Sequence, residues 1–176
     1  MNFRSKVLLN VAVRATIMSV SPVSAEMPPA TAWNDGAEIV TLHAEGAQLY
    51  ECKVDAGNGS ASEPRALRWK FREPIATLMT DGESIGRHYT GPNWDHIDGS
   101  GVKGKAVAST PGATPNDIPW LKLNVVEHRG TGILSGVTTI QRINTKGGVA
   151  PESCENPGSY LSVPYSADYV FLRGAT

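Results

Sequence analysis

Histidine, tryptophan and aspartate side chains gather in one stretch of the sequence, residues 82–100. This stretch contains His88, Trp94, Asp95, His96 and Asp98. If the break at Gly91-Pro92 forms a tight hairpin, His88 lies opposite Asp95. A carboxylate beside an imidazole favours the protonated ring, so this pair has the composition of a general base or of an oriented metal ligand.

A metal site is one interpretation of this stretch. His88 and Asp95 together with His96 or His128 would supply two histidines and a carboxylate, a set that suits a transition metal, and Asp98 is a further candidate partner of His88. The alternative is structural, because aspartate beside glycine usually serves turns and a histidine near a strand end usually bonds to backbone. The sequence also lacks the H-x-H, H-E-x-x-H and C-x-x-C spacings.

Motifs for catalysis are equally sparse. There is no G-x-S-x-G nucleophile elbow and no phosphate-binding G-x-x-x-x-G-K-[ST] loop. Paired carboxylates near Trp94 leave a hydrolase as an alternative. No catalytic residue is therefore assigned, the sequence leans away from an enzyme, and no cofactor is required. The candidate ligand-binding residues are His88, Tyr89, Trp94, Asp95 and Asp98, and the candidate metal ligands are His88 and His96.

The elements that must position these residues are short strands. In residues 66–72 Leu67, Trp69 and Phe71 alternate with basic residues, which is typical of a half-buried antiparallel strand. Tyr165, Tyr169 and Phe171 share one face of a later strand. The 18 Gly and 12 Pro residues add frequent turns. The pattern predicts a single all-β domain, an antiparallel sandwich or a barrel, with long Pro/Gly loops.

The N-terminus resembles an export signal. Arg4 and Lys6 precede an apolar run, and Val23-Ser-Ala25 matches a small-residue cleavage site. We expect residues 1–25 to be a signal peptide, residues 26–45 a Pro-rich lead-in with a first short strand, and residues 46–176 the all-β domain. The protein would be periplasmic or secreted. Beyond the signal, no stretch is apolar for long enough to span a membrane.

The net charge argues against one class of partner, and the cysteine content predicts a disulfide. The formal net charge is −1, and removal of a basic signal makes it more negative, so we expect no nucleic-acid partner. The chain has two cysteines, Cys52 and Cys154, and in an exported protein a single pair most simply forms a disulfide. We expect this bond to join an early strand to the loop before the last strand, and the first and last strands to pair.

A series of motifs resembles the exported domain-of-unknown-function family 3455 over about residues 44–173. The motifs are Gln48-Leu-Tyr-Glu-Cys52, Gly86-Arg-His-Tyr-Thr-Gly-Pro-Asn-Trp94, Asp98-Gly-Ser100, Ile118-Pro-Trp-Leu121, Ile140-Gln-Arg-Ile-Asn-Thr145, Gly147-Gly148, Cys154 and Tyr165-Ser-Ala-Asp-Tyr-Val-Phe171. The resemblance implies a secreted or periplasmic β domain without an established activity. We expect a binding or interaction module for a small-molecule or protein ligand, with the metal-binding protein and the hydrolase as alternatives.

Overall fold

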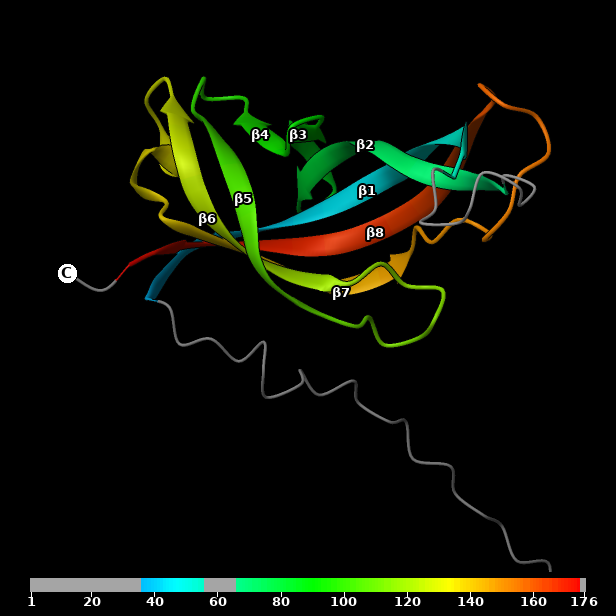
Figure 1. The fold of residues 1–176 in the computed structure, drawn as a ribbon. Coiled ribbons are helices and arrows are strands. Elements are labelled where there is room, and N and C mark those ends of the chain that lie inside the picture. Colours follow the sequence, from blue (N-terminus) through cyan, green and yellow to red (C-terminus); the bar gives the residue numbers. More distant parts are fainter. Residues whose placement is uncertain (1–35, 56–65, 175–176) are drawn as a thin grey trace, which may run out of the picture.

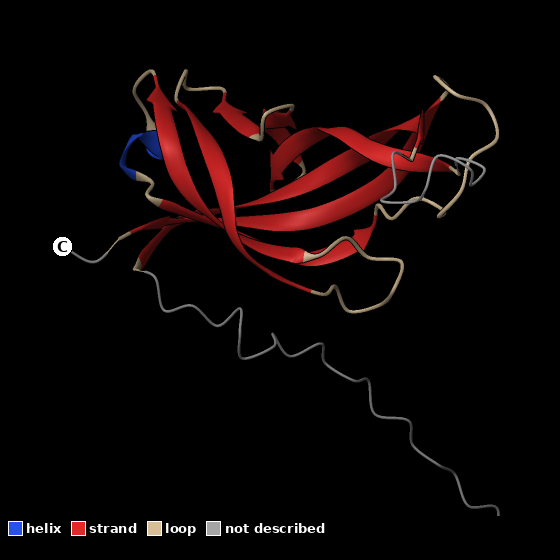
Figure 2. Cartoon of the chain, viewed as in Figure 1, coloured by secondary structure: helices blue, strands red, loops and turns tan. Residues whose placement is uncertain are grey.

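The computed structural model of the chain describes residues 36–55 and 66–174. They form one antiparallel sheet of eight strands that closes into a barrel, each strand pairing with the next and β8 with β1 (Figure 1). The strands are β1 (Ala37–Val54), β2 (Leu67–Thr80), β3 (Glu83–Tyr89), β4 (Asn93–His96), β5 (Gly101–Thr110), β6 (Trp120–Arg129), β7 (Thr139–Gly147) and β8 (Tyr160–Arg173). One short 3-10 helix, η1 (Ile133–Gly136), lies between β6 and β7 (Figure 2).

This architecture confirms the all-β prediction and resolves the choice between sandwich and barrel. The runs before and after Gly46, which the sequence pattern separates, belong to one continuous strand β1. The predicted signal peptide lies outside the described residues. Within the described part of the chain, no helix is long and apolar enough to cross a membrane.

The alternation of residues along the strands builds the interior of the barrel. On β8, Tyr165, Ala167, Tyr169 and Phe171 are all buried, while their neighbours at the start of the strand are more exposed. They join one core cluster with Leu42, Leu78, Val102 and Ile140 from other strands. Full burial of a large apolar side chain stabilises the fold by roughly 1.5–3 kcal/mol.

Side chains of η1 and of the residue that follows it close one end of the barrel. Leu134 of η1 and the following Val137 have no exposed surface and belong to the core cluster. The first and last strands meet at this end, where Ala37 pairs with Arg173. The end that contains η1 is therefore the closed end, and both described termini leave from it (Figure 1).

At the opposite end, β1, β2 and the start of β8 extend beyond the other strands, and Tyr160 of β8 still pairs with Glu51 of β1. The first residues of β2 pair with β1, but the pairing of β2 with β3 begins only at Ala76. Residues 67–72 form the predicted antiparallel strand, and Leu67 and Trp69 are half-buried, but β3 does not reach them and they stay outside the core cluster. Phe71 is 54% exposed, and its ring meets that of Tyr50 edge to face.

The predicted disulfide between Cys52 and Cys154 is confirmed. It joins β1 to the loop between β7 and β8, with a Cα–Cα distance of 5.9 Å. Two backbone hydrogen bonds hold the same loop, from Cys154 N to Leu67 O and from Gly158 N to Cys52 O. The bond therefore fastens the long loop to the extended β1–β2 end of the barrel, away from η1.

Candidate functional site

The barrel interior contains a cavity of about 150 Å³. Every strand contributes at least one residue to its wall, and the turn between β3 and β4 contributes Gly91 and Pro92. Taken in strand order, these residues include Gln48, Phe71, His88, Trp94, Ala106, Leu123, Arg142 and Tyr169. Because all eight strands line this cavity, it forms only when the barrel is closed.

His88 and Trp94 form the most compact part of this wall. Their rings stack with centroids 4.4 Å apart and planes 9° from parallel. Both side chains are almost fully buried, with exposures of 3% and 1%. The fold thus brings together two of the candidate ligand-binding residues inside the barrel.

The predicted pairing of His88 with Asp95 is wrong by one residue. The observed register places His88 opposite Trp94 and Tyr89 opposite Asn93, so that Arg87 faces Asp95. The turn between the paired residues therefore contains three residues, with Gly91 at a φ of 97°, where the prediction assumed two. Because a shift of one residue moves a side chain to the other face of a sheet, Asp95 lies outside the barrel.

The environment of His88 determines its protonation. Nδ1 lies 2.8 Å from the backbone oxygen of Asn93. Since a carbonyl can only accept, Nδ1 carries the proton and Nε2 carries a lone pair. Burial lowers the pKa of His88 to about 3, and the positive charge of Arg142 acts in the same direction, while the bond to Asn93 opposes them. The ring is therefore neutral at ordinary pH.

Trp94 is held by aromatic neighbours and by a close approach to β5. Its ring meets those of Tyr169 and Phe171 edge to face, at 5.3 and 6.3 Å. A Cβ atom at Gly104 would come within 3.0 Å of Trp94 Cζ3, so glycine leaves the room that the indole occupies. Trp94 Nε1 is buried and has no hydrogen-bond partner among the described residues, and the same holds for Gln48 Nε2.

Two tyrosines and an arginine complete the polar part of the interior. The hydroxyl oxygens of Tyr165 and Tyr169 lie 3.5 Å apart. Burial raises the pKa of both phenols, so both hydroxyls keep their protons. Arg142 pairs with Leu121 on one side and with Tyr169 on the other, and all three residues line the cavity.

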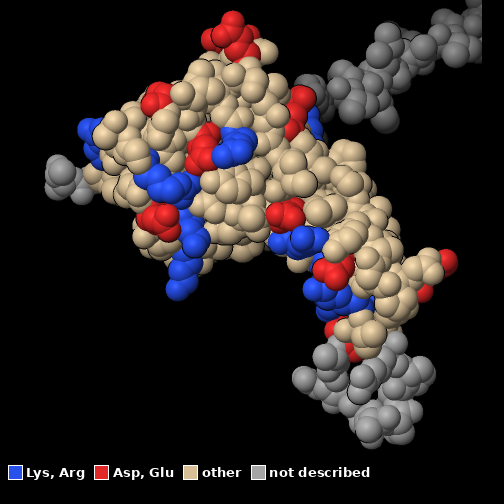
Figure 3. All heavy atoms as spheres, turned by 90° about the horizontal axis from the view of Figure 1, so that it is seen from above, with Lys and Arg blue, Asp and Glu red and all other residues tan. Residues whose placement is uncertain are grey.

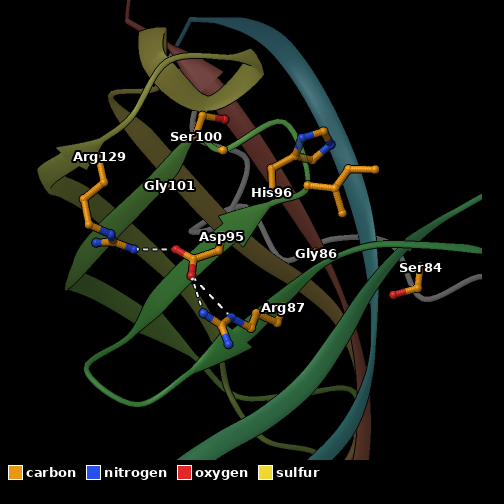
Figure 4. Close-up of a pocket in the computed structure, with 10 residues that line it drawn as sticks. Ser84, Gly86, Arg87, Asp95, His96, Ser100, Gly101 and Arg129 are labelled. Carbon is orange, nitrogen blue, oxygen red and sulfur yellow. Dashed lines mark hydrogen bonds and ion pairs between the residues drawn. The ribbon is translucent and has the colours of Figure 1, made fainter.

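Tyr89 and Asp95 lie on the outer face instead. Asp95 accepts hydrogen bonds from Arg129 Nη2 at 2.7 Å and from Arg87 Nη2 at 3.1 Å (Figure 4). It also accepts one from Tyr89 Oη at 3.0 Å. Partial burial raises the pKa of Asp95, but these bonds outweigh it and hold the pKa below its ordinary value. The network borders a surface hollow of about 540 Å³ that also contains His96. Glu127 Oε1 also lies 3.5 Å from Arg129 Nη1, so the two arginines face two carboxylates, and the network offers less to a ligand than the interior does.

Asp98 organises a turn and contacts η1. Its Oδ1 accepts hydrogen bonds from the backbone nitrogen and the hydroxyl of Ser100, and its Oδ2 accepts one from Ile133 N. The bond from the Ser100 hydroxyl is the main reason that the pKa of Asp98 lies well below its ordinary value. A Cβ at Gly132 would overlap the carboxylate, and the φ of 153° there also favours glycine. This agrees with the structural alternative for Asp98.

The candidate metal ligands do not form a common cluster. His96 Nδ1 lies 3.2 Å from Asp98 N and 3.1 Å from Asp98 Oδ1, whereas His88 bonds to Asn93. Within residues 36–55 and 66–174, no three His, Cys, Asp or Glu side chains are placed to hold one metal ion.

Several residues of the cavity were not predicted as site residues, although the sequence contains weak signals for them. Tyr165 and Tyr169 share the face of a predicted strand, but tyrosines on such a face are ordinary core residues. Gln48 heads the row that contains Tyr50 and Cys52, where a buried amide is unexpected. Arg142 interrupts an otherwise β-branched run, and a charge on the inner face of a central strand is the clearest of these signals.

The face of the molecule in Figure 3 does not show a patch of like charge that would indicate a second binding site. On the face seen in Figure 3, basic and acidic side chains lie next to one another within a largely uncharged surface. The exclusion of nucleic acid as a partner stays a prediction from net charge.

Comparison with known families agrees with the closed barrel as one unit. The family described as Protein of unknown function (DUF3455) matches residues 34–173. The chain belongs to this family. The DUF3455 match spans all eight strands, both cysteines of the disulfide and every residue that lines the cavity. No curated protein and no solved structure shows significant similarity to the chain.

Proposed function

We propose that this DUF3455 protein is an exported binding protein that holds a small, largely apolar ligand inside its barrel. The observation that carries the proposal is the cavity itself, with two buried N–H groups that have no hydrogen bond within the described part of the chain, Trp94 Nε1 and Gln48 Nε2. Trp94 Nε1 is the stronger case, because the Gln48 amide also acts on the Tyr165 hydroxyl, whose pKa it lowers against the larger effect of burial. A buried donor without a partner costs roughly 1–3 kcal/mol. A ligand oxygen that accepts from either group recovers part of that cost.

The walls and the size of the cavity define the ligand. Apolar or aromatic side chains surround it, among them Leu121, Leu123, Trp94, Tyr169 and Phe71. A cavity of about 150 Å³ resembles in volume an apolar cavity of roughly 150 Å³ that is known to bind benzene. The ligand is therefore close in size to one aromatic ring with a polar substituent, and a larger ligand would extend past Pro92 and Phe71 into solvent.

The same geometry gives less support to the catalytic and metal alternatives. A general base works best with a pKa near the pH at which it operates. His88, with a pKa of about 3, holds its lone pair too weakly for that role. Asp95 and Asp98 are both occupied by hydrogen bonds outside the cavity.

The test is an NMR titration with benzyl alcohol and benzamide, two ring-sized probes that each carry an acceptor. Binding inside the barrel should shift the indole N–H resonance of Trp94, which a Trp94→Phe variant assigns. Ala106→Phe places a ring at the cavity and should abolish the shift. Lys105→Phe is the matched control, because Lys105 is exposed and does not line the cavity.

Two results would overturn the proposal. The first is that neither probe shifts the Trp94 resonance up to its solubility limit. The second is that the shifts are equal in the Ala106→Phe and Lys105→Phe variants, which would place binding elsewhere on the protein.

A further inference from the structure

The charges that line the cavity are unbalanced. Within residues 36–55 and 66–174, two arginines, Arg72 and Arg142, belong to the wall, and no aspartate or glutamate does. A cation in a partly desolvated site is costly without a compensating anion. The cavity therefore needs an anion only if no carboxylate outside the wall forms an ion pair with the guanidinium groups of Arg72 and Arg142.

Arg72 is neutralised. Its Nε lies 3.2 Å from Glu73 Oε1, and its guanidinium lies over the ring of Tyr160 at 5.1 Å from the centroid. Its side chain is also 46% exposed, so solvent screens the charge. Arg72 therefore needs no further partner.

Arg142 is not neutralised. Its Nε and Nη2 donate to the backbone oxygen of Pro119, at 3.0 and 2.7 Å, which fixes the guanidinium without cancelling its charge. Among the described residues, no carboxylate forms an ion pair with it. Burial lowers the pKa of His88, and the positive charge of Arg142 lowers it further. Burial raises the pKa of Tyr169, and the charge of Arg142 opposes that effect. The field of Arg142 therefore reaches the cavity interior.

The groups around Arg142 are mainly hydrogen-bond donors. The unpartnered N–H groups of Gln48 and Trp94 line the same cavity, and the hydroxyl of Tyr169 stays protonated. A guanidinium surrounded by N–H and O–H donors fits an acceptor with negative charge better than a neutral one. The stacked rings of His88 and Trp94 provide a flat wall for the rest of the ligand.

Building on the proposed function, we propose that the ligand is a small organic carboxylate whose anionic group binds Arg142 and whose ring-sized apolar body lies against His88 and Trp94. A carboxylate supplies the negative charge that the lining of the cavity lacks beside Arg142. The volume of about 150 Å³ limits the enclosed body to about one ring.

The experiment measures dissociation constants of benzoate, benzamide, benzylamine and acetate for the wild-type protein by NMR titration. Benzoate should bind about tenfold or more tightly than benzamide, since hydrogen bonds to charged groups exceed neutral ones by that order. Benzylamine, which carries a positive charge on the same ring, should not bind measurably. Acetate, which carries the carboxylate without the ring, should bind far more weakly than benzoate.

Two arginine variants test whether Arg142 causes the preference for benzoate over benzamide. Arg142→Met should make benzoate no better than benzamide, whereas Arg72→Met, the other cavity arginine, should retain the preference. The four-probe comparison on the wild type stands by itself if Arg142→Met fails to fold.

The outcomes separate the two proposals. If no ring-bearing probe binds, the proposed function is wrong and the carboxylate inference is wrong with it. If benzamide matches benzoate and Ala106→Phe abolishes both, the barrel binds ligands but the carboxylate inference is wrong. Equal affinity for acetate and benzoate would also overturn it, because Arg142 would then act as a simple anion site without a pocket for the ring.

Discussion

The buried imidazole of His88 predicts how the stability of the barrel depends on pH. In the folded protein burial lowers the pKa of this ring from 6.5 to about 3, so it stays neutral. In the unfolded chain the ring has its ordinary pKa of about 6.5 and binds a proton as the pH falls. Protonation then stabilises the unfolded state, so the free energy of unfolding decreases with pH below about 6.5.

The size of the effect follows from the two pKa values. The loss approaches roughly 1.4 kcal/mol per pH unit between the unfolded and the folded pKa. Integrated from pH 8 to pH 5, it amounts to about 2 kcal/mol. The loss levels off only near the folded pKa, at about pH 3.

A His88→Asn variant isolates this contribution. Its amide nitrogen can replace Nδ1 as the donor to Asn93 O but does not titrate. Urea unfolding of both proteins at pH 8, 7, 6 and 5 gives the free energy of unfolding at each pH. The wild type should lose about 2 kcal/mol more than the variant between pH 8 and pH 5. The other histidines and all carboxylates are present in both proteins and cancel in the difference.

The range from pH 8 to pH 7 is an internal control, because the ring is largely neutral in both states there and the two curves should run parallel. Curves that stay parallel down to pH 5 would refute the argument. They would mean that His88 takes up a proton in the folded protein, which the stacked and buried geometry does not allow.

Two further predictions concern stability away from the cavity. Replacement of Cys52 and Cys154 by serine should lower the free energy of unfolding by about 4–5 kcal/mol on the chain-entropy model, because the bond spans 102 residues; equal urea midpoints for the two proteins would contradict it. Ser100→Ala should cost roughly 1–3 kcal/mol, since the buried hydroxyl accepts from Leu134 N at 3.2 Å and donates to Asp98. Thermal or urea unfolding measures this loss. A decrease in the free energy of unfolding below about 0.5 kcal/mol is typical of an ordinary surface substitution and would show that the hydrogen bonds of Ser100 do not stabilise the fold.

Sequence pattern predicted the features of the fold that depend on local alternation and on composition. The face shared by Tyr165, Tyr169 and Phe171 lies inside the barrel, and the single cysteine pair is bonded. The segment that includes Phe71 has the same alternation, yet that side chain is exposed. Alternation shows which residues share a face, but it does not show whether another strand covers that face.

The candidate site was predicted in part, for a related reason. His88 and Trp94 were predicted as ligand-binding candidates because they lie in the stretch where histidine, tryptophan and aspartate gather, and they meet in the cavity. Asp95 was assigned to the wrong face because the number of residues in the turn at Gly91 fixes the register, and the sequence does not reveal that number. Arg142 became significant only once Tyr169, distant in sequence, was known to be its neighbour on β8.

The pairing of β1 with β8 also governs how the chain reaches its folded state. Each of the other pairs joins consecutive strands, so these strands can pair in the order in which they are synthesised. β1 must keep one edge open until residues 160–173 arrive, and an open edge is a template for pairing with other chains. Contacts of such long sequence separation slow folding. Closure of the barrel therefore requires residues 160–173, whereas the Cys52–Cys154 bond requires only the loop that precedes them.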